Sequence, residues 1–325
     1  MVGDSTLAAR LREKLRLPVL AGPMFIASTP ELVVAQCKAG IVGTIPALNL
    51  RSTPALDEAI IGIKAQLQAH DAAHPERASA PFGVNLVAHA TNDRLDADLE
   101  VILRHQVPLV IVALAASAQI VEKVHAYGGL VWNDIVTDRH ARKCAEAGVD
   151  GLIAVCAGAG GHTGNLSPFA FVQELRQWWR GPLALSGCIA TGASILAAQA
   201  MGADFAYIGS PFLATAEANT PDGYKQMIVE SSAKDIVVTN CFTGVNATFL
   251  RPSLVAHGLD PDNLARREGG ISIKDGGANA KAWRDIWSAG QGVGAVRASG
   301  PASAFIDRLA AEYADARTRL AELAS

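Results

Sequence analysis

Short apolar runs recur along the chain, and most follow a helix-like segment that ends at glycine. Gly40 precedes the run at residues 41–45, and Gly148 precedes the run at residues 151–155. A glycine that ends a helix and leads into a buried strand is typical of a helix-to-strand connection. Counting such runs predicts eight strands, at residues 18–21, 41–45, 82–86, 109–113, 130–133, 151–155, 183–186 and 205–209.

Segments with helical spacing separate these runs. We expect helices to begin at Thr29-Pro30 and Thr53-Pro54 and to cover residues 92–105, 117–126, 138–147, 167–179 and 192–200. Eight strands that alternate with helices predict a (β/α)8 TIM barrel, and a doubly wound open sheet is the alternative. We favour the barrel because the strand count reaches eight and ligand-like loops follow many strands. An open sheet would concentrate such loops near one crevice.

The alternation stops after Gly209, where polar and turn residues become frequent. We interpret residues 215–296 as an appended, mainly helical region on the substrate side that covers the mouth of the barrel. Residues 301–323 have the apolar stripe of an amphipathic helix, which we expect to return to the barrel wall. The predicted barrel therefore comprises residues 1–214 and 297–325.

Composition excludes several classes of function. Of the 325 residues, 50% are hydrophobic and the net charge is −3, with no basic run that would indicate a nucleic-acid surface. No apolar stretch approaches the roughly 18 residues that span a membrane. Residues 1–17 lack the apolar core of a signal peptide, so we expect a cytoplasmic protein. The five cysteines are odd in number and form no CxxC pair, so no metal site or disulfide framework is indicated.

The strongest candidate for chemistry is the stretch at residues 157–165, Ala-Gly-Ala-Gly-Gly-His-Thr-Gly-Asn. It connects the sixth strand to a helix that begins at Ser167-Pro168, and it is longer than a minimal turn. Its glycines, Gly160 and Gly161 among them, let a ligand approach the backbone closely. His162 is the only ionisable side chain in the stretch, which makes it the candidate catalytic residue.

The ends of the strands supply the other candidates, because the active sites of barrels form there. Small residues after the seventh and eighth strands could bind a phosphate through their N–H groups, and Asn85 and Asn133 could hydrogen-bond a heterocycle. Asp134 could be a site residue at the end of the fifth strand or a solvated charge in a loop. We interpret Cys188 as a packing residue rather than a nucleophile. Together these ends suggest a flat phosphorylated cofactor, of which FMN fits best, although many barrels bind a sugar phosphate in this way. The candidate strand-end residues are Ala21, Gly22, Pro23, Met24, Asn85, Asn133, Ser186, Gly187, Cys188, Gly209 and Ser210.

Over nearly its whole length the chain resembles the nitronate monooxygenase family, formerly called 2-nitropropane dioxygenases. The segments that carry the resemblance are residues 21–24, 83–86, 159–164, 186–187, 208–210 and 290–294, and Ala-Gly-Gly-His-Thr-Gly is the most specific. The resemblance implies noncovalent FMN, with its ring held by residues 21–24 and Asn85. It also implies that His162 acts on the substrate beside the flavin. Gly187, Cys188, Gly209 and Ser210 would then hold the phosphate, and Gln291 and Gly292 would close over it.

The resemblance implies oxidation of an alkyl nitronate, or of the parent nitroalkane, by O2 to a carbonyl compound and nitrite. The alternative is an NAD(P)H-dependent reductase of a quinone or an enoyl thioester, because such relatives share the histidine motif. The chain has no GxGxxG fingerprint for nicotinamide. Two departures from the family pattern stand out: the loop at residues 187–192 lacks an aspartate, and Asn133 stands where many relatives have lysine or another residue. A homodimer is a further expectation.

Overall fold

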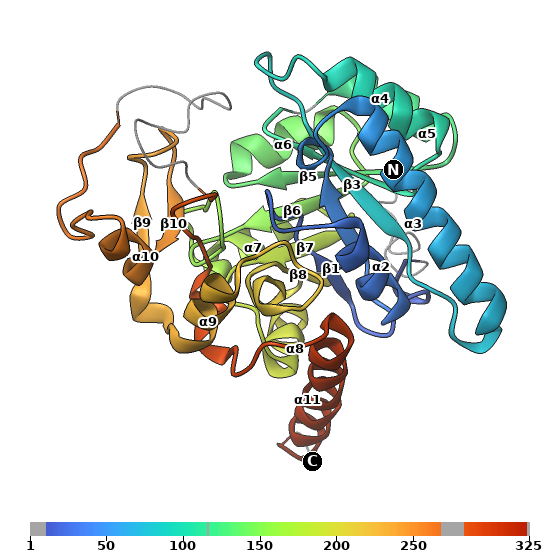
Figure 1. The fold of residues 1–325 in the computed structure, drawn as a ribbon. Helices are drawn as coiled ribbons and strands as arrows, with labels where there is room; N and C mark the ends of the chain where they lie inside the picture. The colour runs from blue at the N-terminus through green and yellow to red at the C-terminus, as the bar shows by residue number, and fades with distance from the viewer. Residues whose placement is uncertain (1–10, 116, 268–282, 324–325) are drawn as a thin grey trace.

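Eight parallel strands form a barrel in the computed structural model, which describes residues 11–115, 117–267 and 283–323 (Figure 1). Strands β2 to β8 pair in sequence order, and β8 pairs with β1. A parallel bridge between Leu20 and Val42 joins β1 to β2 and completes the ring. The strands are β1 (Val19–Ala21), β2 (Gly43–Pro46), β3 (Phe82–Val87), β4 (Leu109–Ala113), β5 (Leu130–Ile135), β6 (Gly151–Val155), β7 (Leu183–Ser186) and β8 (Phe205–Ile208).

Helices connect successive strands and cover the outside of the barrel. Their ends follow local signals: the Thr29 side chain accepts a hydrogen bond from the Leu32 N–H at the start of α2, and Gly202 ends α8 with a φ of 110°. The helix after Ser167 begins at Pro168 as predicted, but the Ser167 side chain makes no capping bond. The connecting helices are α2 (Pro30–Lys38), α3 (Thr53–Ala73), α4 (Leu95–Arg104), α5 (Ala118–His125), α6 (Asp138–Glu146), α7 (Pro168–Arg176) and α8 (Gly192–Met201).

The C-terminal helix α11 (Ala302–Leu323) takes the eighth helix position. It packs against α8 and α2, on either side of the β8–β1 pair, and buries Ile306 and Leu309. The predicted return of this helix to the barrel wall is therefore correct, and the (β/α)8 barrel is confirmed.

Two apolar layers follow from the alternation of side chains along each strand. One layer fills the inside of the barrel and includes Leu20, Ile111, Trp132 and Phe205. The other layer packs strands against helices and includes residues of opposite parity, such as Val131. The rings of Trp132 and Phe205 meet edge to face at 5.5 Å between centroids. This packed interior is the base on which the top layer of side chains rests.

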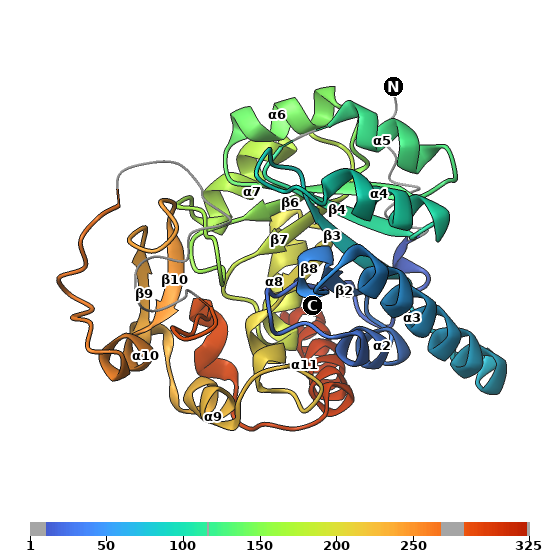
Figure 2. The ribbon, with the colours of Figure 1, turned by 45° about the horizontal axis from the view of Figure 1, so that its top comes forward.

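Between β8 and α11 the chain forms a lobe beside the barrel, which Figure 2 shows with β9, β10 and α10 together. The lobe contains α9 (Asp222–Glu230), α10 (Arg251–Ala256) and an antiparallel pair, β9 (Ile236–Thr239) with β10 (Ala247–Leu250). Short 3-10 helices lie at Ser210–Ala214, Ala233–Asp235 and Gln291–Ala295. We expected residues 215–296 to be mainly helical, and the β9–β10 pair was not predicted.

The boundaries assigned to the two regions stay predictions, as do the homodimer and the cytoplasmic location. Among the described residues, no helix is both long enough and apolar enough to cross a membrane.

Candidate functional site

A cavity of ≈ 960 Å³ opens at the carboxyl ends of the barrel strands. Each of the eight strands, or the residue directly after it, contributes to the floor. The floor residues are Gly22, Pro46, Asn85, Ala113, Asp134, Val155, Ser186 and Tyr207. The layer of the barrel interior nearest the carboxyl ends is therefore the bottom of the site, as the barrel architecture predicts.

Strand parity decides which predicted residues reach this floor. Trp132 points into the barrel, so Asp134, two residues later, faces the cavity, whereas Asn133 between them is fully buried and does not line it. Neither polar atom of the Asn133 side chain has a hydrogen-bond partner among the described residues. Ala21 is likewise buried in the layer between strands and helices. This placement does not support a cofactor contact through the side chains of Ala21 and Asn133. The residues that follow them, Gly22 and Asp134, face the cavity instead.

Small residues after β7 and β8 form one end of the cavity. Gly187, Cys188, Gly209 and Ser210 all line it, together with Gly292 from the lobe. The N–H groups of Cys188 and Gly209 donate no hydrogen bond to a described residue. Free N–H groups on a glycine-rich surface suit an oxyanion. The residues present therefore fit the phosphate of FMN.

The Cys188 side chain packs against this cradle rather than into a reactive arrangement. Cys188 has a φ of 60°, a left-handed conformation that favours glycine. The Cys188 Sγ lies 3.8 Å from the Gln291 Oε1. A Cβ added to Gly158 would lie only 2.3 Å from the same Sγ. Although Cys188 is exposed, partial desolvation by the surrounding loops raises the pKa of its thiol, so Cys188 stays protonated at neutral pH. Gln291 lies over this loop but does not line the cavity.

A second side of the cavity is the glycine loop that carries His162. The loop extends the β9–β10 pair, because His162 forms an antiparallel bridge with Ala247 of β10. The N–H of Thr248 donates to the Gly161 O at 2.9 Å, and the N–H of Thr163 donates to the Asn246 O at 3.1 Å. The lobe therefore holds the histidine loop through backbone hydrogen bonds.

Side chains from the segment after residue 283 complete this arrangement. The Ser288 Oγ accepts a hydrogen bond from the Gly161 N–H at 3.2 Å, and the Ser210 Oγ accepts one from the Gly290 N–H at 2.7 Å. A Cβ on Gly290 would lie 2.6 Å from the Gly158 O, so this contact requires glycine. The barrel loops and the lobe are thereby fastened to each other around the cavity.

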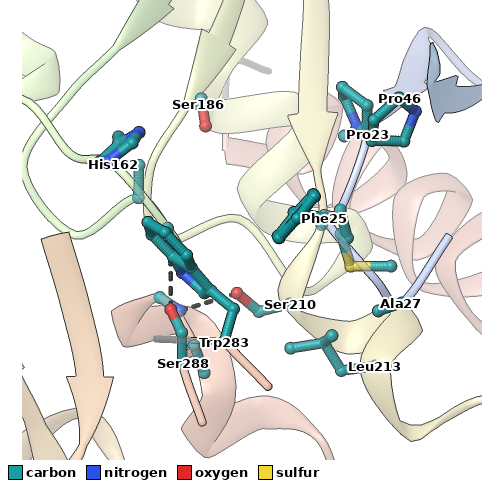
Figure 3. Close-up of a pocket in the computed structure, with 18 of the residues that line it drawn as sticks. Pro23, Phe25, Ala27, Pro46, His162, Ser186, Ser210, Leu213, Trp283 and Ser288 are labelled. Carbon is teal, nitrogen blue, oxygen red and sulfur yellow. Dashed lines mark hydrogen bonds between the residues drawn. The ribbon is translucent and has the colours of Figure 1, made fainter. Parts of the chain in front are cut away.

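Three aromatic rings line the upper wall (Figure 3). The His162 and Trp283 rings meet edge to face with centroids 5.0 Å apart, and Phe25 meets Trp283 in the same way at 6.4 Å. These distances are typical of favourable aromatic pairs. Phe25 is 49% exposed, so the row presents an apolar wall to a ligand.

His162 is exposed to the open cavity, but the protein atoms around the recess partly desolvate its ring. This desolvation lowers the pKa of His162, because burial disfavours the imidazolium ion. No described carboxylate forms an ion pair with His162. The ring is therefore neutral at neutral pH and can accept a proton.

Asn85 takes a place consistent with its predicted role. Its Nδ2 donates to the Ile111 O at 3.1 Å, which fixes the amide plane and leaves the Oδ1 without a described partner. Pro23, Met24, Gly160 and Gly161 also line the cavity, at different sides of it. A planar ligand between the cradle after β7 and β8 and Asn85 on β3 would lie across the barrel axis, above the floor.

Sequence reasoning did not identify several residues of this site. Phe25 follows the predicted segment at residues 21–24 directly, and Tyr207 shares the inward parity of Phe205 on β8. Strict alternation from Trp132 and Phe205 could have found Asp134 and Tyr207. The sequence has no signal for the contacts of Tyr224 and Ser288, which depend on the path of the lobe.

Comparisons with known proteins show the family to which the chain belongs. The sequence model of the family described as nitronate monooxygenase matches residues 9–312. A nitronate monooxygenase of Paraburkholderia phytofirmans is 27% identical over 75% of this chain and 76% of its own length. A nitroalkane oxidase structure from Streptomyces ansochromogenes aligns with a TM-score of 0.76 and 25% identity, over 95% of this chain and 99% of that one.

Two other relatives differ in name. A (3aS,4S,5R,7aS)-5-hydroxy-7a-methyl-1-oxo-octahydro-1H-indene-4-carboxyl-CoA dehydrogenase of Rhodococcus jostii is 28% identical over 77% of this chain and 68% of its own length. The putative monooxygenase Rv1533 of Mycobacterium tuberculosis is 35% identical, but the match covers 51% of this chain and only 44% of that protein. With the barrel, the glycine loop and a family match over most of its length, the chain is an oxidoreductase that belongs to the nitronate monooxygenase family.

Proposed function

We propose that the protein is an FMN-dependent oxidoreductase that oxidises alkyl nitronates with O2 to a carbonyl compound and nitrite. The observation that carries the proposal is the position of His162. Its neutral ring faces a cavity that also contains the glycine-rich cradle, and an apolar wall adjoins it. Proton transfer, cofactor binding and exclusion of water can thus take place in one recess.

The residues of the chain would divide the binding of FMN between two regions. Gly187, Cys188, Gly209 and Ser210 would hold the phosphate, and Met24 and Asn85 would contact the ring. When bound, FMN supplies the electron-accepting chemistry. The protein contributes position, charge and shielding from solvent.

His162 would act on the substrate carbon. A neutral nitroalkane must lose the proton from the carbon that bears the nitro group, and a neutral imidazole with a lowered pKa can accept it. A preformed nitronate has already lost this proton and needs only to be bound. The edge contact with Trp283 and the backbone pairing with β10 would hold the imidazole in place during proton transfer.

The aromatic row would select the substituent of the substrate. Phe25 and Trp283 offer apolar faces at the upper wall, so an alkyl chain would be desolvated there. Removal of water from this recess also strengthens the hydrogen bonds that the site makes with the nitro group.

The decisive experiment is anaerobic reduction of the purified, FMN-loaded protein, monitored by stopped-flow absorbance. Propionate 3-nitronate, NADH and NADPH are offered separately. We expect rapid bleaching with the nitronate and slow or no bleaching with the nicotinamides. Rapid reduction by NADH at micromolar concentrations would instead favour the reductase alternative, which the dehydrogenase named among the relatives supports. A protein that releases no FMN on denaturation and takes up none would contradict both.

A further inference from the structure

One carboxyl group in the floor of the cavity has no role in the proposed function. Asp134 lies near the end of β5, where it pairs in register with Ile153 of β6. Its parity with Trp132 turns the side chain toward the barrel axis, and the residue lines the cavity. A ligand that spans from the cradle after β7 and β8 to Asn85 on β3 crosses the floor that Asp134 lines.

Asp134 has no partner that would compensate a negative charge. It makes no hydrogen bond and no ion pair with any residue in the described ranges, and its Oδ1 is completely covered by protein. The other titratable groups near it are Tyr207 from β8 and Cys144 from α6, and both are uncharged at neutral pH because burial raises their pKa values. Ala113 and Val155, its floor neighbours on β4 and β6, are apolar.

The remaining titratable groups of the cavity are paired elsewhere or uncharged. The Arg284 guanidinium binds the Asp285 carboxylate through two contacts of 2.7 Å. His162 and Cys188 are neutral at neutral pH, and Tyr224 donates to the backbone O of Ser288. None of these groups is hydrogen-bonded to Asp134. An ionised Asp134 would therefore have neither a compensating charge nor a hydrogen bond among the described residues, which is costly.

Burial accordingly raises the pKa of Asp134 to about 7. The protonated and ionised forms are then of similar free energy in the open cavity near neutral pH. A planar ligand that covers the floor removes the remaining water and shifts the balance further toward the protonated form. A protonated carboxyl group is a hydrogen-bond donor, and the acceptor it lacks in the protein can come from the ligand.

We propose that Asp134 carries a proton beneath the bound flavin ring and donates it in a hydrogen bond to an acceptor atom of that ring. Asp134 is thus a cofactor-contacting residue, and flavin binding takes up a proton whenever the open site holds the carboxylate. The proposal rests on the proposed function only in that FMN is the ligand. Failure to bind FMN would overturn the proposed function, whereas binding without proton uptake would overturn only the role of Asp134.

The test compares flavin affinity with pH in the wild type and in Asp134→Asn. The asparagine amide keeps a donor at this position but cannot titrate. Riboflavin is the first probe, because it lacks the phosphate that would itself titrate, and FMN is the second. We expect the dissociation constant of the wild type for riboflavin to rise about 15-fold between pH 7 and pH 8.5, since each unit above the pKa costs up to tenfold. The constant of Asp134→Asn should stay flat over this range.

A second measurement needs no change at Asp134. Calorimetric titration with riboflavin at pH 8, in two buffers with different heats of ionisation, should reveal uptake of close to one proton per flavin bound. His162→Asn serves as the matched control and should keep this uptake, because the proton belongs to the floor and not to the histidine loop. Equal pH profiles for the wild type and Asp134→Asn, or uptake of no proton by the wild type, would overturn the proposal.

Discussion

His162 and Ala247 are paired as neighbours in an antiparallel bridge, although they lie 85 positions apart in the sequence. The histidine therefore lies on a loop of the barrel, between β6 and α7, but the backbone of that loop is hydrogen-bonded to the lobe. Backbone bonds from Thr163 and Thr248 on either side of the bridge fix the path of the loop. The lobe thus determines where the candidate catalytic side chain stands.

Loosening this pairing should lower turnover more than flavin affinity. The Thr248 hydroxyl lies 3.3 Å from both the Ala159 O and the Gly161 O, and the residue is fully buried. Thr248→Val keeps the shape but leaves these carbonyl groups without the hydroxyl, at a cost of about 1 kcal/mol. We expect a several-fold lower kcat with nitronate and an unchanged FMN dissociation constant. Serine in place of Thr248 keeps the hydroxyl and should retain kcat.

His162→Asn should separate the two forms of the substrate. General-base catalysis is worth roughly 10²–10⁴-fold, so kcat/KM for a neutral nitroalkane should fall by that factor. The preformed nitronate needs no deprotonation and should lose only about 1–3 kcal/mol of anion binding. Steady-state oxygen consumption with both forms measures the difference. Small, equal losses on both substrates would remove His162 from the chemistry.

The pH profile should follow the lowered pKa of His162. Because desolvation disfavours the imidazolium ion, the ring stays neutral at pH values below its usual 6.5. For the neutral nitroalkane, kcat/KM should therefore hold constant as pH falls to 6.5 and decrease only below it. This acidic limb should be absent in His162→Asn. A limb centred above pH 6.5 would contradict a desolvated histidine.

Asp134 should make the flavin-free protein less stable as pH rises. Its pKa is about 7 in the folded protein and 3.8 without the fold, so folding binds the proton more tightly. This stabilisation is complete below about pH 4 and is lost between pH 4 and 7. Relative to the wild type, Asp134→Asn should gain up to about 4 kcal/mol of unfolding free energy on going from pH 4 to pH 8. Urea denaturation of both proteins at the two pH values measures this gain. The same change of unfolding free energy with pH in both proteins would contradict the prediction.

Gly290→Ala should damage the cradle through backbone crowding. A Cβ there would lie 2.6 Å from the Gly158 O and 2.8 Å from the Gly160 N, so the two loops must separate. Overpacking of this kind costs typically about 1–3 kcal/mol, and we expect FMN to dissociate at least tenfold more readily. Gly62→Ala is the matched control: it lies within α3, where a Cβ meets nothing within 4 Å. That variant should bind FMN as the wild type does.

The barrel could be predicted from sequence because its signals are local. Each strand is a short apolar run, and Gly40, Gly148 and Gly202 end helices with positive φ where the pattern placed them. The floor of the site depends on the alternation of side chains along β5, which turns Asp134 rather than Asn133 toward the cavity. The β9–β10 pair escaped prediction because neither of its runs follows a helix that ends at glycine, the signal that marked most of the barrel strands. Its partner, the histidine loop, is brought to it only by the complete fold.

The two ends of the lobe are neighbours in space. Thr215 and Gly300 form a parallel bridge, and the Ala216 N–H donates to the Gly300 O at 2.9 Å. The segment between Thr215 and Gly300 therefore begins and ends at neighbouring positions between β8 and α11. Replacement of this segment need not disturb the barrel strands or α11. Exchange of this segment can therefore alter the walls that contact the substrate while the barrel strands and α11 stay in place, provided that the contacts of Gly290 and β10 with the histidine loop are kept. Such an arrangement gives one scaffold a route to relatives with different reactions.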